Sequence, residues 1–426
     1  MQQKKVFSHI FLTVMMIVAL FVISSSALLS AVPSVVAAAP DHITLTWVDD
    51  PRTTQTITWR TDVNTSAGLV QYVEATAGGA FPAKAGGATA AVQGLSTNLG
   101  DASIHSVTLT GLKPGTRYRY RVGDGASWSE PHTFVTAATT VPGFKFLVFG
   151  DSQSSNYDVW RATIHRAYEA NPDAVFLTNV GDLVDVGQDF AQWNGWFAAA
   201  QGVVDTIPAM PVTGNHESYT PERQFSLPVY FTAQFKLPLN GPEALKGQVY
   251  SFDYGDVHFI MLDSQENEEK RFVPAMLENE KAWLEEDLRA ANKKWKVVFM
   301  HRPPYNNKTY EANDNIQAAF VPIFDKYHVD VVFTGHDHTY ARTYALNGGA
   351  VVDSPARGTL YVATGRSGTK TYTNLSARWW NEFFYNPLDE PNYIAVQVKG
   401  DSMTVEAVKQ SGVLIDSWTV DKAVKH

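Results

Sequence analysis

Residues 174–185 have the sequence AVFLTNVGDLVD, an apolar run that ends in Gly181-Asp182 and is followed by Asp185. A nearly continuous apolar run of this length is typical of a strand that is buried on both faces, as in the parallel sheet of an α/β domain. Because ligands of such sheets gather beyond the carboxyl ends of the strands, the carboxylates placed here are candidate functional residues.

Four further apolar runs also end in side chains that can bind a metal ion. The segments that follow them are Asp151-Ser152-Gln153, Asn215-His216-Glu217, His301-Arg302 and His336-Asp337-His338. A single Asp or Asn at such a place is usually a turn or helix-capping residue, and a single His is usually a hydrogen-bonded structural residue. Five strand ends of the same kind are poorly explained by five independent structural roles, so we predict that they form one site.

Amphipathic stretches separate the apolar runs. Residues 159–170 and 190–204 are predicted helices, and Leu277, Leu284 and Leu288 fall on one face of a third. Buried strands that alternate with helices favour an α/β domain, which we place at residues 139–426.

Residues 39–138 have a different pattern. Ile43, Leu45 and Trp47 alternate with polar residues, which is the two-residue period of half-buried strands. The stretch from residue 75 to residue 100 is rich in Gly, Ala and Thr and is predicted as long loops. An all-β domain is expected here, with a linker at residues 136–143.

Residues 1–38 have the order of a secretory signal peptide. Lys4 and Lys5 precede an apolar run from Ile10 to Ile23, and a stretch of small residues ends at Ala38. A retained membrane anchor is the less favoured alternative, because the run is shorter than the roughly 20 residues of a spanning helix. Cleavage after Ala38 predicts a secreted protein without a membrane anchor, and the loss of two lysines changes its net charge from −9 to −11.

Composition excludes several kinds of chemistry. The 426-residue chain has no cysteine, which excludes disulfides, a thiol nucleophile and thiolate metal sites. Its 34 Lys and Arg against 43 Asp and Glu argue against a nuclease with a basic groove, so no nucleic acid is expected as a stable partner. The oligomeric state stays open.

The five segments resemble the five signatures of the calcineurin-like metallophosphoesterases, namely D-x-Q, G-D-x-x-D, G-N-H-E, V-x-x-H (Val298 to His301) and G-H-x-H. The β-rich segment before them, with Pro114-Gly115 and Tyr118, is similar to a fibronectin type III sandwich. The combination is similar to the purple acid phosphatase branch. The resemblance implies a four-layer αββα domain preceded by an all-β sandwich, with Tyr118 as the corner tyrosine that hydrogen-bonds back to the chain.

The resemblance also implies two divalent or trivalent transition metal ions, with iron, manganese and zinc left open, and a bridging ligand, Asp182. The other implied ligands are Asp151 and His338 for the first ion, and Asn215, His301 and His336 for the second ion. Gln153 is either a further ligand of the first ion or a residue that contacts a ligand.

Two positions depart from the purple acid phosphatases: Gln153, where related enzymes have His or Gly, and Asp185. The tyrosine that binds ferric iron in that branch is replaced here by Asp185, so the protein should not be purple. A carboxylate at this position resembles bacteriophage-type phosphatases, in which it pairs with the histidine of G-N-H-E. On that analogy Asp185 orients His216, which acts as a general acid toward the leaving oxygen or stabilises the transition state.

The implied activity is hydrolysis of small phosphomonoesters by a metal-activated hydroxide, as in an acid phosphatase. Phosphodiesters, including nucleotides, are the alternative substrate class, because the same two-metal core serves both in this superfamily. A non-catalytic module that binds a wall polymer is a second alternative, but it predicts missing ligands and none is missing. Four residues near the motifs either line the site or only pack: Arg302, Tyr305, Tyr340 and Arg366.

Overall fold

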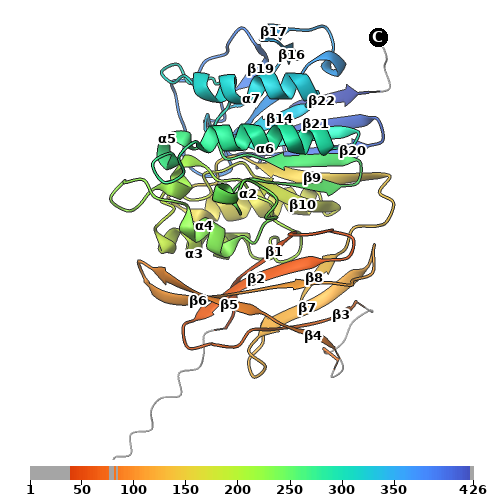
Figure 1. The fold of residues 1–426 in the computed structure, drawn as a ribbon, viewed down its shortest axis with the longest axis vertical. Coiled ribbons are helices and arrows are strands. Elements are labelled where there is room, and N and C mark those ends of the chain that lie inside the picture. Colours follow the sequence, from red (N-terminus) through yellow and green to blue (C-terminus); the bar gives the residue numbers. More distant parts are fainter. Residues whose placement is uncertain (1–38, 76–80, 83–84, 423–426) are drawn as a thin grey trace, which may run out of the picture. The chain divides into compact units, whose positions relative to one another are not determined.

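The computed structural model describes residues 39–75, 81–82 and 85–422. The predicted signal peptide at residues 1–38 lies outside the described residues. Figure 1 shows an all-β part, in red to yellow, followed by an α/β part that extends to the C-terminus. No helix among the described residues has the length and apolar character needed to span a membrane.

The all-β part is a sandwich of two four-stranded antiparallel sheets, with strand orders β1-β2-β6-β5 and β4-β3-β7-β8. The strands are β1 (Asp41–Thr46), β2 (Gln55–Asp62), β3 (Leu69–Glu74), β4 (Gly86–Thr89), β5 (Ala91–Thr97), β6 (Gly100–Leu109), β7 (Arg117–Gly123) and β8 (His132–Val135). Trp59, Tyr120 and Phe134 fill the space between the sheets. Ile43 and Leu45 are buried in this core, but the strand is not half-buried as predicted, because Thr44 and Thr46 are buried as well.

The prediction of long loops between residues 75 and 100 is wrong in part, because β4 and β5 lie there. The side chains of these strands are mostly exposed, and of the seven residues of β5 only Leu95 is buried. Edge strands exposed on both faces need no alternation of apolar and polar residues, so the pattern used for prediction does not develop.

The predicted tyrosine corner is confirmed. The backbone N–H of Lys113 donates a hydrogen bond to the hydroxyl of Tyr118, with an N–O distance of 2.9 Å. The ring of Tyr118 is buried and stacks on Phe134. The hydroxyl therefore fixes the Pro114-Gly115 turn against the sheet that carries it.

The α/β part contains two large sheets, with strand orders β10-β9-β20-β21-β22 and β11-β12-β13-β14-β18-β15-β19. The first sheet consists of β9 (Gly143–Phe149), β10 (Ala174–Asn179), β20 (Asn392–Lys399), β21 (Ser402–Lys409) and β22 (Leu414–Asp421). The second consists of β11 (Tyr250–Tyr254), β12 (Val257–Met261), β13 (Trp295–Met300), β14 (Val331–Thr334), β15 (Tyr340–Thr343), β18 (Leu360–Thr364) and β19 (Asn381–Tyr385). A small hairpin is formed by β16 (Leu346–Asn347) and β17 (Ala350–Val351).

The helices of this part are α2 (Tyr157–Ala170), α3 (Phe190–Ala200), α4 (Val229–Gln234), α5 (Glu266–Glu269), α6 (Met276–Ala290) and α7 (Asp314–Tyr327). The predicted helix at residues 190–204 ends four residues early, where the chain turns through Gly202 with a φ of 92°. Only Gly adopts such a conformation without strain. The three predicted leucines, Leu277, Leu284 and Leu288, lie in α6 and are buried.

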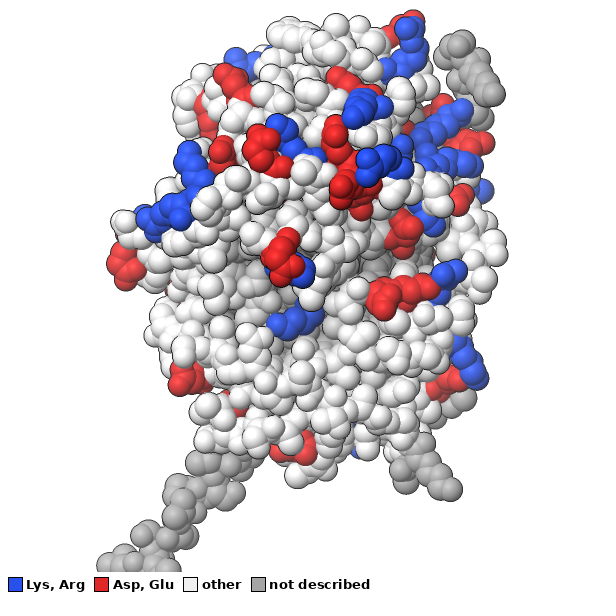
Figure 2. All heavy atoms as spheres, viewed as in Figure 1, with Lys and Arg blue, Asp and Glu red and all other residues white. Residues whose placement is uncertain are grey.

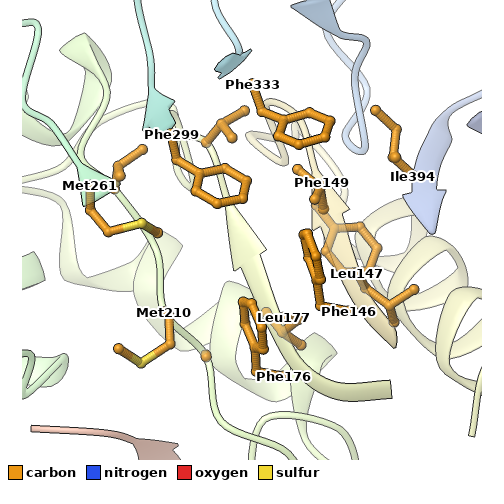
Figure 3. Packing of buried hydrophobic residues seen from close by; sticks show 14 of the residues in the cluster. Phe146, Leu147, Phe149, Phe176, Leu177, Met210, Met261, Phe299, Phe333 and Ile394 are labelled. Carbon is orange, nitrogen blue, oxygen red and sulfur yellow. The ribbon is translucent and has the colours of Figure 1, made fainter. Parts of the chain in front are cut away.

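Alternate residues of the second sheet face two different cores, which produces the predicted four layers. Phe299 and Phe333 point toward the first sheet, where they join Phe146 and Phe176 (Figure 3). Val298, one residue from Phe299, instead packs in the second core with the buried faces of α6 and α7. On the first sheet, Phe149 meets Trp160 of α2 edge to face at 5.1 Å.

Parallel strands bring the five motif segments to one edge. Strands β9 and β10 are parallel in the first sheet, and β12, β13, β14 and β18 are parallel in the second. Residues 209–212 run parallel to β10 through two isolated bridges, from Leu177 to Ala209 and from Val180 to Val212. The loops after these strands therefore meet at the carboxyl edge of both sheets.

The sandwich is hydrogen-bonded to the segment that leads into one of these loops. The backbone N–H of Leu45 in β1 donates to the carbonyl of Val204 at 2.8 Å, and the N–H of Ala209 donates to the carbonyl of Leu45 at 2.8 Å. The hydroxyl of Tyr120 donates to the carbonyl of Asp205 at 2.8 Å. Residues 204–212 thus lie between β1 and β10.

Candidate metal centre

Two groups of buried side chains at this edge have donor atoms close enough to hold a metal ion. One group is Asp151, Asp182 and His338, and the other is Asp182, His301 and His336, with the donor atoms of each group within 4.8 Å of one another. Asp182 belongs to both groups, so its carboxylate is placed to bridge two ions. His336 and His338, one residue apart, point to different groups because both have left-handed backbone conformations, with φ of 66° and 57°.

Each of the three histidines has one ring nitrogen anchored away from the donor groups. Nδ1 of His301 lies 2.8 Å from the carbonyl of Val180, and Nδ1 of His338 lies 2.8 Å from the carbonyl of Lys370. Nε2 of His336 lies 2.8 Å from Glu311 Oε1. The two carbonyls can only accept, so Nδ1 of His301 and Nδ1 of His338 carry the protons and the opposite nitrogens are free to bind a metal. Nε2 of His336 has both an acceptor, Glu311, and a donor, Arg302 Nη1 at 3.2 Å.

The distances among the remaining donor atoms fit bound cations. Nε2 of His301 and Nδ1 of His336 lie 3.2 Å apart, and the amide oxygen of Asn215 lies 3.1 Å from each. Nε2 of His338 lies 2.6 Å from Asp151 Oδ2 but is buried without a hydrogen-bond partner. Donor atoms at such distances repel one another unless a cation, either a proton or a metal ion, lies among them.

The pKa shifts of these groups follow from the charges packed around each of them. Burial raises the pKa of Asp182, but His301 and His216 outweigh it and hold the pKa well below its usual range. Burial lowers the pKa of His301, but Asp182 outweighs it and raises the pKa to about 9. Burial and the nearby Lys308 hold the pKa of His336 well below its usual range. A metal ion would replace the proton that Asp182 stabilises on His301.

Glu217 connects two of the ligand-bearing loops. Its Oε2 accepts from the backbone N–H groups of Asp182 at 2.9 Å and Gly214 at 2.7 Å, and its Oε1 accepts from Leu183 at 2.8 Å and Val184 at 3.3 Å. Burial and the Asp182 carboxylate raise the pKa of Glu217 to about 8, a shift that a cation on Asp182 would oppose. This carboxylate therefore positions Asp182 relative to the loop that carries Asn215.

The glycines that precede the ligands make room for other ligands. A Cβ on Gly214 would lie 2.3 Å from Asp182 Oδ1, and a Cβ on Gly335 would lie 2.5 Å from Asp151 Oδ1. Both distances are far below van der Waals contact, so a side chain at either position would displace a ligand. Steric exclusion of any side chain therefore explains the Gly of G-N-H-E and the Gly of G-H-x-H.

His216 lies next to the bridging carboxylate of Asp182, and the backbone of Asp185 holds its ring. Its Nδ1 lies 2.6 Å from the Asp185 carbonyl oxygen and 3.3 Å from the Asp185 carboxylate, so the carbonyl is the nearer acceptor. Its Nε2 lies 3.0 Å from Lys370 Nζ and 3.8 Å from Asp182 Oδ2. Burial lowers the pKa of His216. This geometry describes a neutral imidazole that donates from Nδ1 and accepts at Nε2.

The carboxylate of Asp185 is shared by two cations. Arg223 Nη2 lies 2.7 Å from Oδ2, and Lys370 Nζ lies 3.3 Å from Oδ1. Partial burial raises the pKa of Asp185, but Arg223, His216 and Lys370 outweigh it and lower the pKa.

Gln153 is buried beside the first donor group. Its amide satisfies both neighbours only with the nitrogen 3.2 Å from Asp182 Oδ2 and the oxygen 3.0 Å from Lys370 Nζ. In that orientation Gln153 donates to a ligand and turns its oxygen away from the donor atoms. Its role as a ligand of the first ion stays a prediction.

Four residues were predicted either to line the site or only to pack, and each of them makes contacts inside the structure. Both ends of the Arg302 guanidinium bind carboxylates, Glu268 at 2.8 Å and Glu311 at 2.7 Å. Arg366 donates to the carbonyls of Pro387 and Gly368. Tyr305 packs against Tyr361, and the Tyr340 hydroxyl bonds Asp416.

Lys370 and Glu311 contact the centre but were missed from the sequence. Lys370 follows β18, a further parallel strand that ends at this edge. Searching for polar side chains after this strand, as was done for the other five segments, would have found its loop. Glu311 lies in residues 301–313, a loop in which no spacing indicates which side chain turns inward.

Two family models match the chain. The N-terminal domain of purple acid phosphatase matches residues 40–136, and the calcineurin-like phosphoesterase model matches residues 144–340. The second match includes all seven predicted ligands. The chain belongs to the calcineurin-like phosphoesterases, with a purple acid phosphatase N-terminal domain.

Acid phosphatases from an animal and from plants are similar to this chain over much of its length. The chain is 26% identical to mouse acid phosphatase type 7 over 89% of this chain and 91% of that protein. It is 30% identical to purple acid phosphatase 21 of Arabidopsis thaliana over 71% of this chain and 65% of that protein. The structure of a purple acid phosphatase from yellow lupin (Lupinus luteus) seeds superposes with a TM-score of 0.73 at 18% identity, over 90% of this chain and 74% of that one.

The domain is therefore that of a metal-dependent phosphoric ester hydrolase with a dinuclear centre. The predicted cofactor, a pair of iron, manganese or zinc ions, is the one that purple acid phosphatases use. The donor set of carboxylate, imidazole and amide oxygen suits each of these metals.

Proposed function

We propose that the protein is a secreted, acid phosphatase-like enzyme that hydrolyses small phosphomonoesters. The observation that carries this proposal is the Asp182 carboxylate, which is shared by two buried donor groups. A shared carboxylate holds two cations roughly 3.5–4 Å apart, the spacing that serves the attacking and leaving oxygens of an in-line displacement. The assigned roles follow the sequence: Asp151, Gln153, Asp182, Asn215, His301, His336 and His338 bind or adjoin the metals, and His216 with Asp185 assists catalysis.

Two ions bound here would supply an activated hydroxide and Lewis acids for the phosphoryl oxygens. The chain contributes the geometry around them. His216 faces the bridging carboxylate from the solvent side, with its imidazole fixed by the Asp185 carbonyl. Nε2 of His216 accepts from the Lys370 ammonium at 3.0 Å.

Secretion is proposed from residues 1–38 and not from the fold. The same proposal places domain boundaries after residues 38 and 138. The strands on either side of the second boundary are β8, which ends at Val135, and β9, which begins at Gly143.

We expect no stable nucleic acid partner. On the face shown in Figure 2, Lys and Arg side chains lie among Asp and Glu side chains and form no continuous basic stripe.

Substitution of Asp182 tests the proposal. The Asp182→Ala variant should lose one or both metals and all measurable hydrolysis, because it removes a ligand from both donor groups. Metal content by elemental analysis and hydrolysis of 4-nitrophenyl phosphate, with and without a chelator, are the measurements. Asp173→Ala, which removes a carboxylate that is 63% exposed and lies outside the centre, is the control. A fully active Asp182→Ala protein would refute the assignment.

A comparison of esters decides between the two substrate classes. The metal-loaded enzyme is expected to hydrolyse 4-nitrophenyl phosphate with a higher kcat/KM than methyl 4-nitrophenyl phosphate, which has the same leaving group and one charge fewer. A higher kcat/KM for the diester would favour a phosphodiesterase.

A further inference from the structure

Lys370 places a cation beside the metal donors at a position that no motif of the family marks. Two short paths connect its ammonium to the bridging carboxylate. One passes through His216, whose Nε2 lies 3.0 Å from Lys370 Nζ and 3.8 Å from Asp182 Oδ2. The other passes through the Gln153 amide, which bonds Lys370 on one side and Asp182 on the other.

Lys370 and the charged side chains that pair with it sum to a net positive charge beside the metal donors. Its only carboxylate partner among the described ion pairs is Asp185, and the second oxygen of Asp185 is bound by Arg223 at 2.7 Å. Two cations and one carboxylate sum to one positive charge. The metals would add to it, whereas the ligands Asp151 and Asp182 are committed to the ions.

Exposure increases from the metal donors outward through this cluster. The side chain of Asp182 is 2% exposed and that of His216 is 8% exposed, while Lys370 and Asp185 are 31% and 33% exposed. The ammonium is therefore reachable from solvent and lies at the border of the buried donors.

We propose that Lys370 binds a charged, non-bridging oxygen of a phosphomonoester dianion and so makes the centre select monoesters over diesters. This inference rests on the proposed phosphatase function and names the residue that sets its substrate class. A monoester dianion has two negative charges on its phosphoryl oxygens, and a diester has one. An ammonium fixed at this position favours the more highly charged ester.

The Lys370→Met variant removes the charge and keeps the length of the side chain. The carbonyl that holds His338 belongs to the backbone of Lys370 and is retained, so the metal content should be unchanged. Lys370→Arg keeps the charge and should restore most of the effect. Lys281→Met on α6 makes the same chemical change at an exposed lysine that pairs with Glu278, and it serves as the control.

Three quantities separate the outcomes at about pH 8, above the second phosphate pKa near 6. In Lys370→Met, kcat/KM for 4-nitrophenyl phosphate should fall about 10- to 100-fold, the range of one hydrogen bond to a charged group. For methyl 4-nitrophenyl phosphate it should change less than about 3-fold. The Kd of inorganic phosphate, measured by titration calorimetry on the metal-loaded protein, should rise by about the same 10- to 100-fold.

Equal losses for both esters, or an unchanged phosphate Kd at full metal content, would overturn the assignment of Lys370. Failure of the proposed function has a different signature, because the wild-type protein would then hydrolyse neither ester or would hydrolyse the diester with the higher kcat/KM. The phosphate Kd of the two proteins would still report on Lys370 in that case.

Discussion

Replacing Glu217 by Gln should destabilise the protein strongly although it changes only one atom. The carboxylate has four backbone N–H donors, two on each oxygen. In either orientation of a Gln amide, its NH₂ group faces two of these donors, so two buried N–H groups lose their acceptor. At about 1–3 kcal/mol for each unsatisfied group, the free energy of unfolding should fall by about 2–6 kcal/mol.

The assay is urea unfolding of the metal-free protein, followed by fluorescence, at a pH above the pKa of about 8 at which Glu217 loses its proton, so that the carboxylate is charged. The Kd of Zn²⁺ or Mn²⁺ for the folded variant is measured alongside. Metal affinity should also fall, because Glu217 fixes the backbone of Asp182 against Gly214. Glu278→Gln, at a side chain that is 73% exposed on α6, should change the free energy of unfolding by no more than about 0.5 kcal/mol. A loss below about 1 kcal/mol with unchanged metal affinity would show that Glu217 does not couple the two loops.

Two further predictions concern pH and colour. Although burial lowers it, the pKa of His258 is raised to about 9 by Asp253 and Asp287, so this charged group contributes stability that is complete below the unfolded pKa of 6.5 and lost as the pH rises through 9. His258→Gln should therefore lower the free energy of unfolding, measured by urea, by up to about 3 kcal/mol at about pH 6 and by much less at about pH 10. Equal losses at the two pH values would contradict this. An iron-loaded sample should lack an intense tyrosinate band in the visible spectrum, because Asp185 stands where purple acid phosphatases have the metal-binding tyrosine; such a band would mean that a tyrosine reaches the metal.

Much of the centre could be predicted because the rule that finds it is local. Asp151, Asp182 and His301 each follow a strand that the apolar pattern marks, and the parallel sheets bring the strand ends together. The positions of these residues need no knowledge of distant contacts. The four layers follow in the same way from the alternation of buried strands and amphipathic helices.

What could not be predicted depends on contacts between segments distant in sequence. Lys370 reaches His216 across 154 residues, and Glu311 reaches His336 from a loop without periodicity. Asp185 was expected to orient His216 through its carboxylate, but its carbonyl is the nearer atom, and a carbonyl leaves no trace in the sequence. Strands β4 and β5 were predicted as loops because exposed edge strands have no alternation of buried and exposed residues.

The contact between β1 and residues 204–212 makes the sandwich a structural part of the hydrolase and not a detachable module. A fragment that began at Gly143 would expose the partners of Trp47, which packs against Phe176, Phe252 and Tyr254 in the main core. The carbonyl of Val204 and the N–H of Ala209 would also lose their partner, next to the segment that carries the ligands. Proteolysis within the linker should therefore leave the two pieces associated, and exchange of the sandwich for an unrelated domain should yield an insoluble protein.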